Sequence, residues 1–159
     1  MSRFNSVVPV PLGEIRCLDG KLDTAAKPGI LVTAVGAFGG GSTTHAQPDY
    51  PNAVFTPNTK ENNLGVLIVM EQEDLVLQAI TTEFPINSHV RAHVLKSGEE
   101  CTVHLAAAEV IVPGDKLYTE DNGKVKKVTD ADEVPMFTAI ETATAQSTGD
   151  QLRILARVL

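Results

Sequence analysis

The sequence predicts an all-β protein, with an antiparallel β-barrel or sandwich body at residues 61–159 and an extended arm and loop region at residues 1–60. Strong turn signals recur through the second part, as an antiparallel barrel or sandwich requires. The first part instead holds 6 of the 9 prolines, and proline removes a backbone donor that helices and central strands need. Charge follows the same division, because residues 1–60 carry 5 basic and 4 acidic residues, whereas residues 61–159 carry 8 and 16.

The first 60 residues show little regular patterning. Three valines near the start alternate with Pro9 and Pro11, which predicts an extended or edge segment. The apolar run at 30–35 is short and predicts a strand. A loose loop is expected at 36–44, and the prolines within 45–59 exclude a regular helix there.

Strands of the body are predicted from apolar runs and alternation. Continuous apolar runs occupy 64–70 and 75–80, and the segment 89–95 alternates strictly between apolar and polar residues. A turn at 96–99 is expected to return the chain into a strand on which Cys101, Val103 and Leu105 share one face.

Turn motifs organise the last third of the chain. Asn122-Gly123 supplies the positive φ angles of a type I′ turn, which predicts a hairpin between 116–120 and 124–128. Pro113-Gly114-Asp115 is expected to form the preceding turn. A final hairpin is expected between 137–144 and 152–158.

Composition excludes several classes of partner. The formal net charge is −7 and only 7 of 159 residues are aromatic, without tryptophan, which disfavours nucleic acid as a ligand. No apolar run reaches the roughly 18 residues of a membrane span, and Met1 is not followed by the apolar region of a secretory signal. Two cysteines do not make a disulfide framework and fit a reduced intracellular context.

Motifs for nucleotides and metals are incomplete. The glycines of 36–43 lack the spacing of a dinucleotide fingerprint, and Ser42 stands where a phosphate-binding loop needs lysine. His89 and His93 lie about 13 Å apart on a strand rising roughly 3.3 Å per residue, too far for one metal, so with Arg91 they are expected on a solvent or interface face. We expect no metal and no cofactor.

Motifs for catalysis are equally incomplete. Cys101 and His104 are expected on opposite faces of their strand, which favours a buried, inert Cys101. The acidic clusters at 71–74 and 130–133 lack the spacing of a calcium loop and fit solvated turns. A lipoyl- or biotin-type carrier presents a lysine at a hairpin tip, whereas Lys124 lies just past the tip here. We expect no enzymatic activity.

The last third, about residues 109–159, contains a series of turn and strand motifs: Val112-Pro113-Gly114-Asp115-Lys116-Leu117-Tyr118, Gly123-Lys124-Val125-Lys126-Lys127, Thr138-Ala139-Ile140-Glu141 and Gly149-Asp150-Gln151-Leu152-Arg153-Ile154. In these motifs it resembles the capsid cement, or head decoration, proteins of tailed bacteriophages. Thr138 departs from the pattern, since the family often has glycine at that place. The resemblance implies a non-enzymatic β protein on the outside of an icosahedral shell, which it stabilises against the pressure of the packaged DNA.

The expected function is therefore that of a structural virion protein on the outer surface of the capsid. Its expected partners are the major capsid protein and further copies of itself, as a homotrimer or homodimer. An extended arm would add strands to neighbouring subunits. Apolar residues in irregular, Pro/Gly-rich segments are the candidate interface residues, and packing onto their own body is the alternative for each: Phe4, Val7, Val8, Val10, Phe38, Tyr50 and Phe55.

Two other functions stay open at this stage. A tail or spike-base β domain would use the same architecture, and its copy number per particle would differ. A small β-barrel enzyme or carrier would need a pocket with convergent polar groups, and the motifs above supply none.

Overall fold

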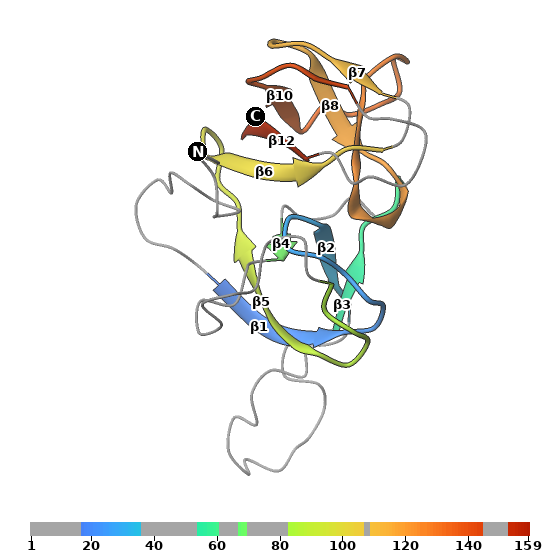
Figure 1. The fold of residues 1–159 in the computed structure, drawn as a ribbon, viewed down its shortest axis with the longest axis vertical. Helices are drawn as coiled ribbons and strands as arrows, with labels where there is room; N and C mark the ends of the chain where they lie inside the picture. Colours follow the sequence, from blue (N-terminus) through green and yellow to red (C-terminus); the bar gives the residue numbers. More distant parts are fainter. Residues whose placement is uncertain (1–16, 36–53, 61–66, 70–82, 107–108, 145–152) are drawn as a thin grey trace.

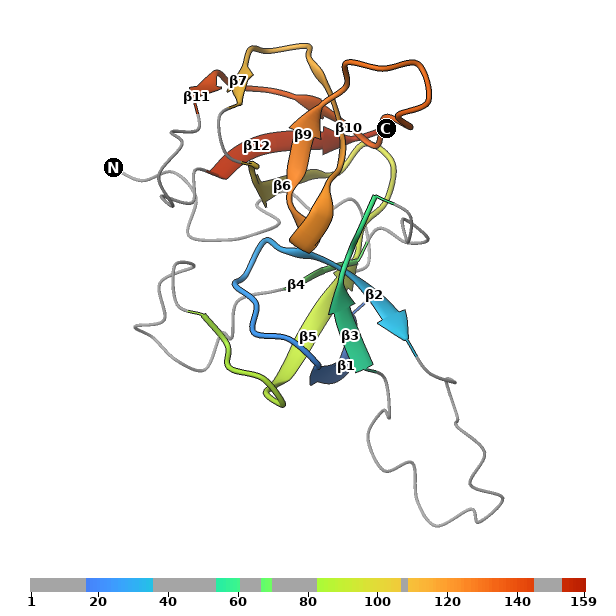
Figure 2. The same cartoon turned by 90° about the vertical axis from the view of Figure 1, so that its right-hand side faces the viewer.

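The computed structural model describes six parts of the chain, and within them the protein is all-β (Figure 1). These parts are residues 17–35, 54–60, 67–69, 83–106, 109–144 and 153–159. The strands form two bodies stacked along the longest axis of the molecule (Figures 1 and 2). Within the described ranges, no helix has the length and apolar character that a membrane crossing needs.

The first body is a closed five-stranded barrel, here called the first barrel. Its strands follow the order β1-β3-β2-β4-β5. All pairs of neighbouring strands are antiparallel except β1 and β3, which run parallel. The strands are β1 (Cys17–Leu22), β2 (Leu31–Val35), β3 (Val54–Pro57), β4 (Leu67–Val69) and β5 (His89–Val94).

Alternation of side chains explains how these strands close. In β1, Gly20 and Leu22 are buried, while Lys21 between them is exposed. In β5, Val90 and Ala92 point into the barrel, as the alternation predicts. The barrel core contains Leu22, Ala26, Ile30, Val32, Phe55, Val69, Phe84, Val90 and Ala92.

The second body is a five-stranded antiparallel sheet, here called the second sheet. Its strands follow the order β6-β12-β10-β8-β9. A bridge between Leu105 and Val125, with the Ala106 N–H donating to the Val125 carbonyl at 2.8 Å, brings its two edges together. The strands are β6 (Glu100–His104), β8 (Lys116–Thr119), β9 (Val125–Lys127), β10 (Phe137–Ala139) and β12 (Arg153–Val158).

A separate two-stranded ribbon lies beside the second sheet. It consists of β7 (Val110–Ile111) and β11 (Ala143–Thr144), which pair antiparallel. One short 3-10 turn, η1 (Asp121–Gly123), joins β8 to β9. Figure 2 shows the ribbon at the end of the molecule farthest from the first barrel.

The boundary between the two bodies differs from the one expected at residue 60. Strands β1, β2 and β3 lie within residues 1–60, yet they complete the first barrel with β4 and β5. The change of architecture falls at residues 95–99, between β5 and β6. Strand β1 contains Gly20 and β3 ends in Pro57, so both resemble irregular chain in sequence, but pairing with long-range partners fixes them as strands. Residues 1–16 and 36–53 lie outside the described residues.

Two of the three expected hairpins are confirmed. Strand β8 pairs with β9, and β10 pairs with β12. The expected hairpin between 89–95 and the strand after residue 100 is wrong, because β5 pairs with β1 and β4 while β6 pairs with β12. The turn itself exists, with Gly98 at φ 88°, but it carries the chain from one body into the other.

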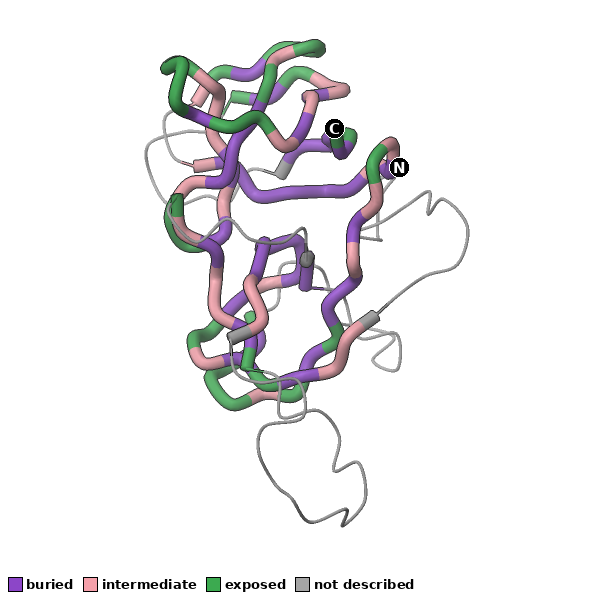
Figure 3. The backbone as a smooth tube through the Cα atoms, turned by 180° about the vertical axis from the view of Figure 1, so that it is seen from behind, coloured by how far each residue is buried: buried purple, intermediate pink, exposed green. Residues whose placement is uncertain are grey.

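The two bodies share part of their apolar core. The core of the second sheet contains Leu31 and Ile68, which belong to strands of the first barrel. Figure 3 shows a continuous buried stretch along β6, at the level where the bodies meet, and exposed loops at both ends of the molecule. Because apolar packing continues from one body to the other, we infer that the two bodies form one folding unit and are not independent domains joined by a linker.

Candidate functional site

The predicted interface residues are mostly outside the described part of the chain. Phe4, Val7, Val8, Val10, Phe38 and Tyr50 lie there, so their contacts remain predictions. Phe55 lies in β3, and its side chain is fully buried in the core of the first barrel. Phe55 therefore packs on its own body, which leaves it no surface for a capsid contact.

The described residues converge instead on the contact between the two bodies, here called the barrel junction. Its apolar part is the pair Leu31 and Ile68, both 0% exposed. They are direct cross-strand partners on β2 and β4. Their neighbours Val32 and Val69 face the opposite way, into the first barrel. Alternation thus lets two adjacent strands contribute to both cores.

The tip of the β8–β9 hairpin docks into this junction. Asn122 and Gly123 have φ angles of 62° and 67°, so the positive φ angles expected from the Asn-Gly sequence are confirmed. The Gly123 N–H donates to the Asn58 carbonyl at 2.8 Å. A Cβ atom on Gly123 would lie 2.2 Å from the Leu31 carbonyl oxygen. The hairpin tip can therefore approach the first barrel because residue 123 has no side chain.

A second close approach joins β6 to the segment before β2. The His104 Nε2–H donates to the Pro28 carbonyl at 2.8 Å, and the ring is buried. A Cβ on Gly29 would lie 2.9 Å from the Thr102 carbonyl oxygen. Both faces of β6 are consequently covered, one by the core of the second sheet and one by the first barrel.

A buried, hydrogen-bonded pair of side chains spans the crossing between the bodies. His93 at the end of β5 lies 3.0 Å from Glu99, measured from Nε2 to Oε2, and both side chains are 0% exposed. The same carboxylate oxygen accepts the Lys96 N–H at 2.8 Å. The expectation that His93 shares a solvent-facing surface with His89 and Arg91 is therefore wrong for His93, because the crossing segment folds back over it. His89 and Arg91 are exposed as expected.

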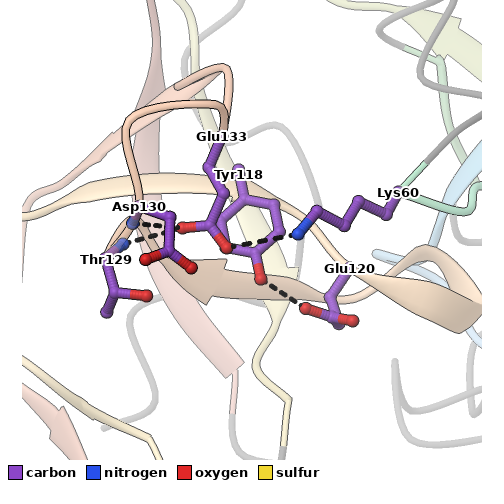
Figure 4. Close-up of polar contacts among 6 residues, drawn as sticks. All are labelled: Lys60, Tyr118, Glu120, Thr129, Asp130 and Glu133. Atoms are coloured by element: carbon purple, nitrogen blue, oxygen red, sulfur yellow. Dashed lines mark hydrogen bonds and ion pairs between the residues drawn. The ribbon is translucent and has the colours of Figure 1, made fainter.

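A polar cluster fastens the segment after β3 to the second sheet (Figure 4). The Lys60 ammonium lies 3.6 Å from the Glu133 carboxylate and 5.6 Å from the centre of the Tyr118 ring. The other Glu133 oxygen accepts the Thr129 and Asp130 N–H groups at 2.7 and 3.1 Å. The Tyr118 hydroxyl donates to Glu120 at 2.5 Å.

The protonation states of this cluster are fixed by its hydrogen bonds. The Thr129 N–H is the largest influence on Glu133 and outweighs burial. With the Asp130 N–H, the Tyr118 hydroxyl and the Lys60 charge, it lowers the carboxyl pKa to about 2. Burial, and then the Glu120 and Glu133 carboxylates, raise the pKa of Tyr118 above its ordinary value. Near neutral pH the cluster thus holds a carboxylate and a protonated phenol, which suits attachment better than proton transfer.

Other groups with possible chemistry are also held inert. Cys101 is fully buried, and burial, reinforced by the nearby Glu99, raises the pKa of its thiol far above the ordinary range. A protonated, covered thiol is a poor nucleophile, so the prediction of a buried Cys101 is confirmed. In the described part of the chain, no three His, Cys, Asp or Glu side chains form a group that could hold a metal ion.

The barrel junction was not predicted from the sequence. The Asn-Gly turn indicated the hairpin but not its docking, because docking depends on the distant Leu31 and Asn58. In the run at 30–35, Leu31 packs in the core of the second sheet, whereas Ile30 and Val32 pack in the first barrel. Because both faces of β2 are covered at the junction, the sequence shows a continuous apolar run and no alternation between apolar and polar residues.

Comparison with known proteins gives a structural likeness only. No protein-family model matches the sequence. No curated protein sequence is significantly similar to it. Among solved structures, the chain is similar to the N base of the head fiber protein gp8.5 of bacteriophage phi29, with a TM-score of 0.57 and 10% sequence identity. The match covers 92% of this chain and 95% of that one, so the two share a fold over nearly their whole length.

Proposed function

We propose that this protein is a structural component of a bacteriophage particle, bound to the outer surface of the head. The observation that carries the proposal is the fold match to a phage head fiber base, which extends over 92% of this chain and 95% of the other. It agrees with the independent resemblance of residues 109–159 to head decoration proteins. The two similarities differ in kind, one in backbone path and one in sequence motifs, and both support a structural protein of the phage particle.

The first motif behind the sequence resemblance adopts the expected turn. Gly114 has φ 94° in the Pro-Gly-Asp turn, and the Asp115 carboxylate accepts the Val112 N–H at 2.9 Å. The Lys127 ammonium lies 2.9 Å from the same carboxylate. Thr138, which replaces the glycine frequent in the family, accepts a hydrogen bond from Lys116 at 2.8 Å, so the departure is accommodated on the sheet surface.

The finer proposal is that the protein acts as a capsid decoration, or cement, protein. The fixed contact between the bodies supports this, because a bridge between capsid subunits must transmit force without bending. A hinge between two domains would instead let the subunits separate before the bridge resisted. In this account the partners are the major capsid protein and further copies of the same chain.

A second candidate is the base of a projecting head fiber, which is the part that the phage phi29 structure represents in its own particle. The same rigid block would then anchor a fiber and add no strength to the shell. The two candidates differ in copy number and in mechanical effect. A cement protein saturates the repeated subunit contacts of the shell and raises its resistance to rupture, whereas a fiber base does not need to raise it.

Heating of DNA-filled heads distinguishes these functions. Heads assembled without the protein are heated with and without saturating purified protein, and DNA release is followed with an intercalating dye. A release temperature several degrees higher in decorated heads supports the cement function. Binding without a shift indicates a fiber base or another head attachment. Absence of binding contradicts the proposed function.

A further inference from the structure

The tip of the β8–β9 hairpin carries the one Asn-Gly pair of the sequence, Asn122-Gly123. Asparagine is a thermolabile residue, and it is most reactive before glycine, because no side chain hinders the amide nitrogen that follows. In the reaction, that nitrogen gives its proton to hydroxide and bonds to the asparagine Cγ, and ammonia leaves. Asn122 is exposed, so water and hydroxide can reach its side chain.

Two features of the docked tip oppose this reaction. Gly123 is buried, and its N–H donates to the Asn58 carbonyl at 2.8 Å, so the attacking nitrogen is already engaged. Asn122 has φ 62° and ψ 27°, and this ψ turns the Gly123 nitrogen away from the Cβ of Asn122. Attack therefore requires the tip to leave Asn58 and to rotate about the Cα–C bond of Asn122.

The close fit of the tip also excludes one product of the reaction. The ring formed by the attack is a succinimide, which water opens at either carbonyl to give aspartate or isoaspartate. Isoaspartate carries the main chain through its Cβ, so the backbone of the tip becomes longer by one carbon. The junction has no spare space, since one carbon added to Gly123 would lie 2.2 Å from the Leu31 carbonyl oxygen and 2.6 Å from the Ile30 Cγ2.

We propose that Asn122 is a deamidation site whose reactivity is controlled by the docking of the hairpin tip at the barrel junction, and that its isoaspartate product no longer docks. The reaction proceeds through local opening of the tip, so its rate is the rate in a free hairpin multiplied by the fraction of molecules with an open tip. The proposal does not depend on head binding, because all the groups involved belong to one chain.

Deamidation of the full chain in mildly alkaline buffer tests the control by docking. The mass of the peptide that contains Asn122 is followed over time in the folded chain and in the chain unfolded by urea. The folded chain is expected to react at least about tenfold more slowly, because a docked segment is open in only a small fraction of molecules. Asn122→Gln should remove the mass change and so assigns it to this residue. Equal rates in the folded and unfolded chains would overturn the proposal.

Two variants separate opening of the tip from unfolding of the whole chain. Ile30→Ala removes the methyl group that lies against Gly123, whereas Val158→Ala removes volume from β12 in the core of the second sheet. Their deamidation rates are compared at urea concentrations where circular dichroism gives both variants the same global stability. Ile30→Ala is expected to react several-fold faster than Val158→Ala. Equal rates would mean that the reaction follows global unfolding and would contradict control by docking.

The isoaspartate form, separated by chromatography, tests the second half of the proposal. Asn122→Asp is the matched control, because it reproduces the new negative charge without lengthening the backbone. The isoaspartate form is expected to unfold at a lower urea concentration than Asn122→Asp, since its tip has lost the contacts with the first barrel. An isoaspartate form as stable as Asn122→Asp would show that the longer tip still docks, against the proposal.

Discussion

Leu31 and Ile68 are direct cross-strand partners on β2 and β4, yet both side chains lie in the core of the second sheet and outside the barrel that carries them. The first barrel therefore contributes its outer surface to the interior of the other body. Apolar burial of this kind is the main stabilising contribution in folding. The shared apolar core and the docked hairpin tip together fix the position of one body relative to the other.

The first prediction concerns cooperativity. Leu31→Ala should lower the free energy of unfolding by about 2–5 kcal/mol, because it leaves a cavity in a fully buried site. Both bodies should lose stability together. Native-state hydrogen exchange checks this, with amides of β5 and β12 expected to report the same loss. If only one of the two strands responded, the shared core would not couple the bodies.

The second prediction concerns the hairpin tip. Gly123→Ala should destabilise the protein by about 1–3 kcal/mol or more, because the new methyl would overlap the Leu31 carbonyl at 2.2 Å and φ is 67°. Gly114→Ala is the matched control. Gly114 also has a positive φ, 94°, but a Cβ there meets nothing within 4 Å. Urea unfolding should show the larger loss at residue 123, and equal losses would mean that the docking contributes nothing.

The third prediction concerns the buried His93–Glu99 pair. Glu99→Ala should lower the free energy of unfolding by about 1–3 kcal/mol, since it leaves the buried His93 ring and the Lys96 N–H without the carboxylate oxygen that they share. The double variant H93L/E99M should regain most of that loss, because apolar side chains of similar volume carry no free-energy penalty for being removed from water. A double-mutant cycle in urea measures both effects. A double variant no more stable than Glu99→Ala would contradict this account of the pair.

The fourth prediction concerns acid. The pKa of Glu133 is about 2 in the folded protein, below its ordinary value of 4.5, so the folded state holds this proton more weakly than the unfolded state. The stabilising contribution is fully present above the ordinary pKa and is lost as the pH falls from 4.5 toward 2. Glu133→Gln should therefore flatten the decline of stability over that interval.

Unfolding followed by circular dichroism at a series of pH values tests this effect. Asp132→Asn, at an exposed position in the same turn, is the control and should keep the wild-type slope. An unchanged slope in Glu133→Gln would show that its backbone hydrogen bonds do not depend on ionisation.

Local chemistry made much of the second sheet predictable. Asn122-Gly123 and Pro113-Gly114-Asp115 favour particular φ angles, and these preferences depend only on residues that are adjacent in the sequence. The pairing of β8 with β9 follows from such a turn. The pairing of β10 with β12 agrees with the expected final hairpin, and residues 145–152 between them lie outside the described part of the chain. The all-β class was predictable for the same reason, together with the proline-rich first part of the chain.

The first barrel and the contacts between the two bodies depend on long-range pairing, which the sequence did not predict. Strand β1 closes the first barrel through a parallel pairing with β3 and an antiparallel pairing with β5, and no local signal encodes such partners. The burial of His93 depends on Glu99 folding back across the crossing. The docking of Gly123 depends on Leu31, more than 90 residues away in the sequence. Alternation identifies which residues share a face, but it does not say what covers that face.

Binding to empty shells tests the central claim most directly. Purified protein is mixed with expanded, undecorated phage capsids, and the bound fraction is read from the pellet after sedimentation over a concentration series. The account predicts saturable binding with a stoichiometry set by the repeated subunits of the shell. Protein that stays folded in the supernatant at every concentration would contradict a place on the head surface.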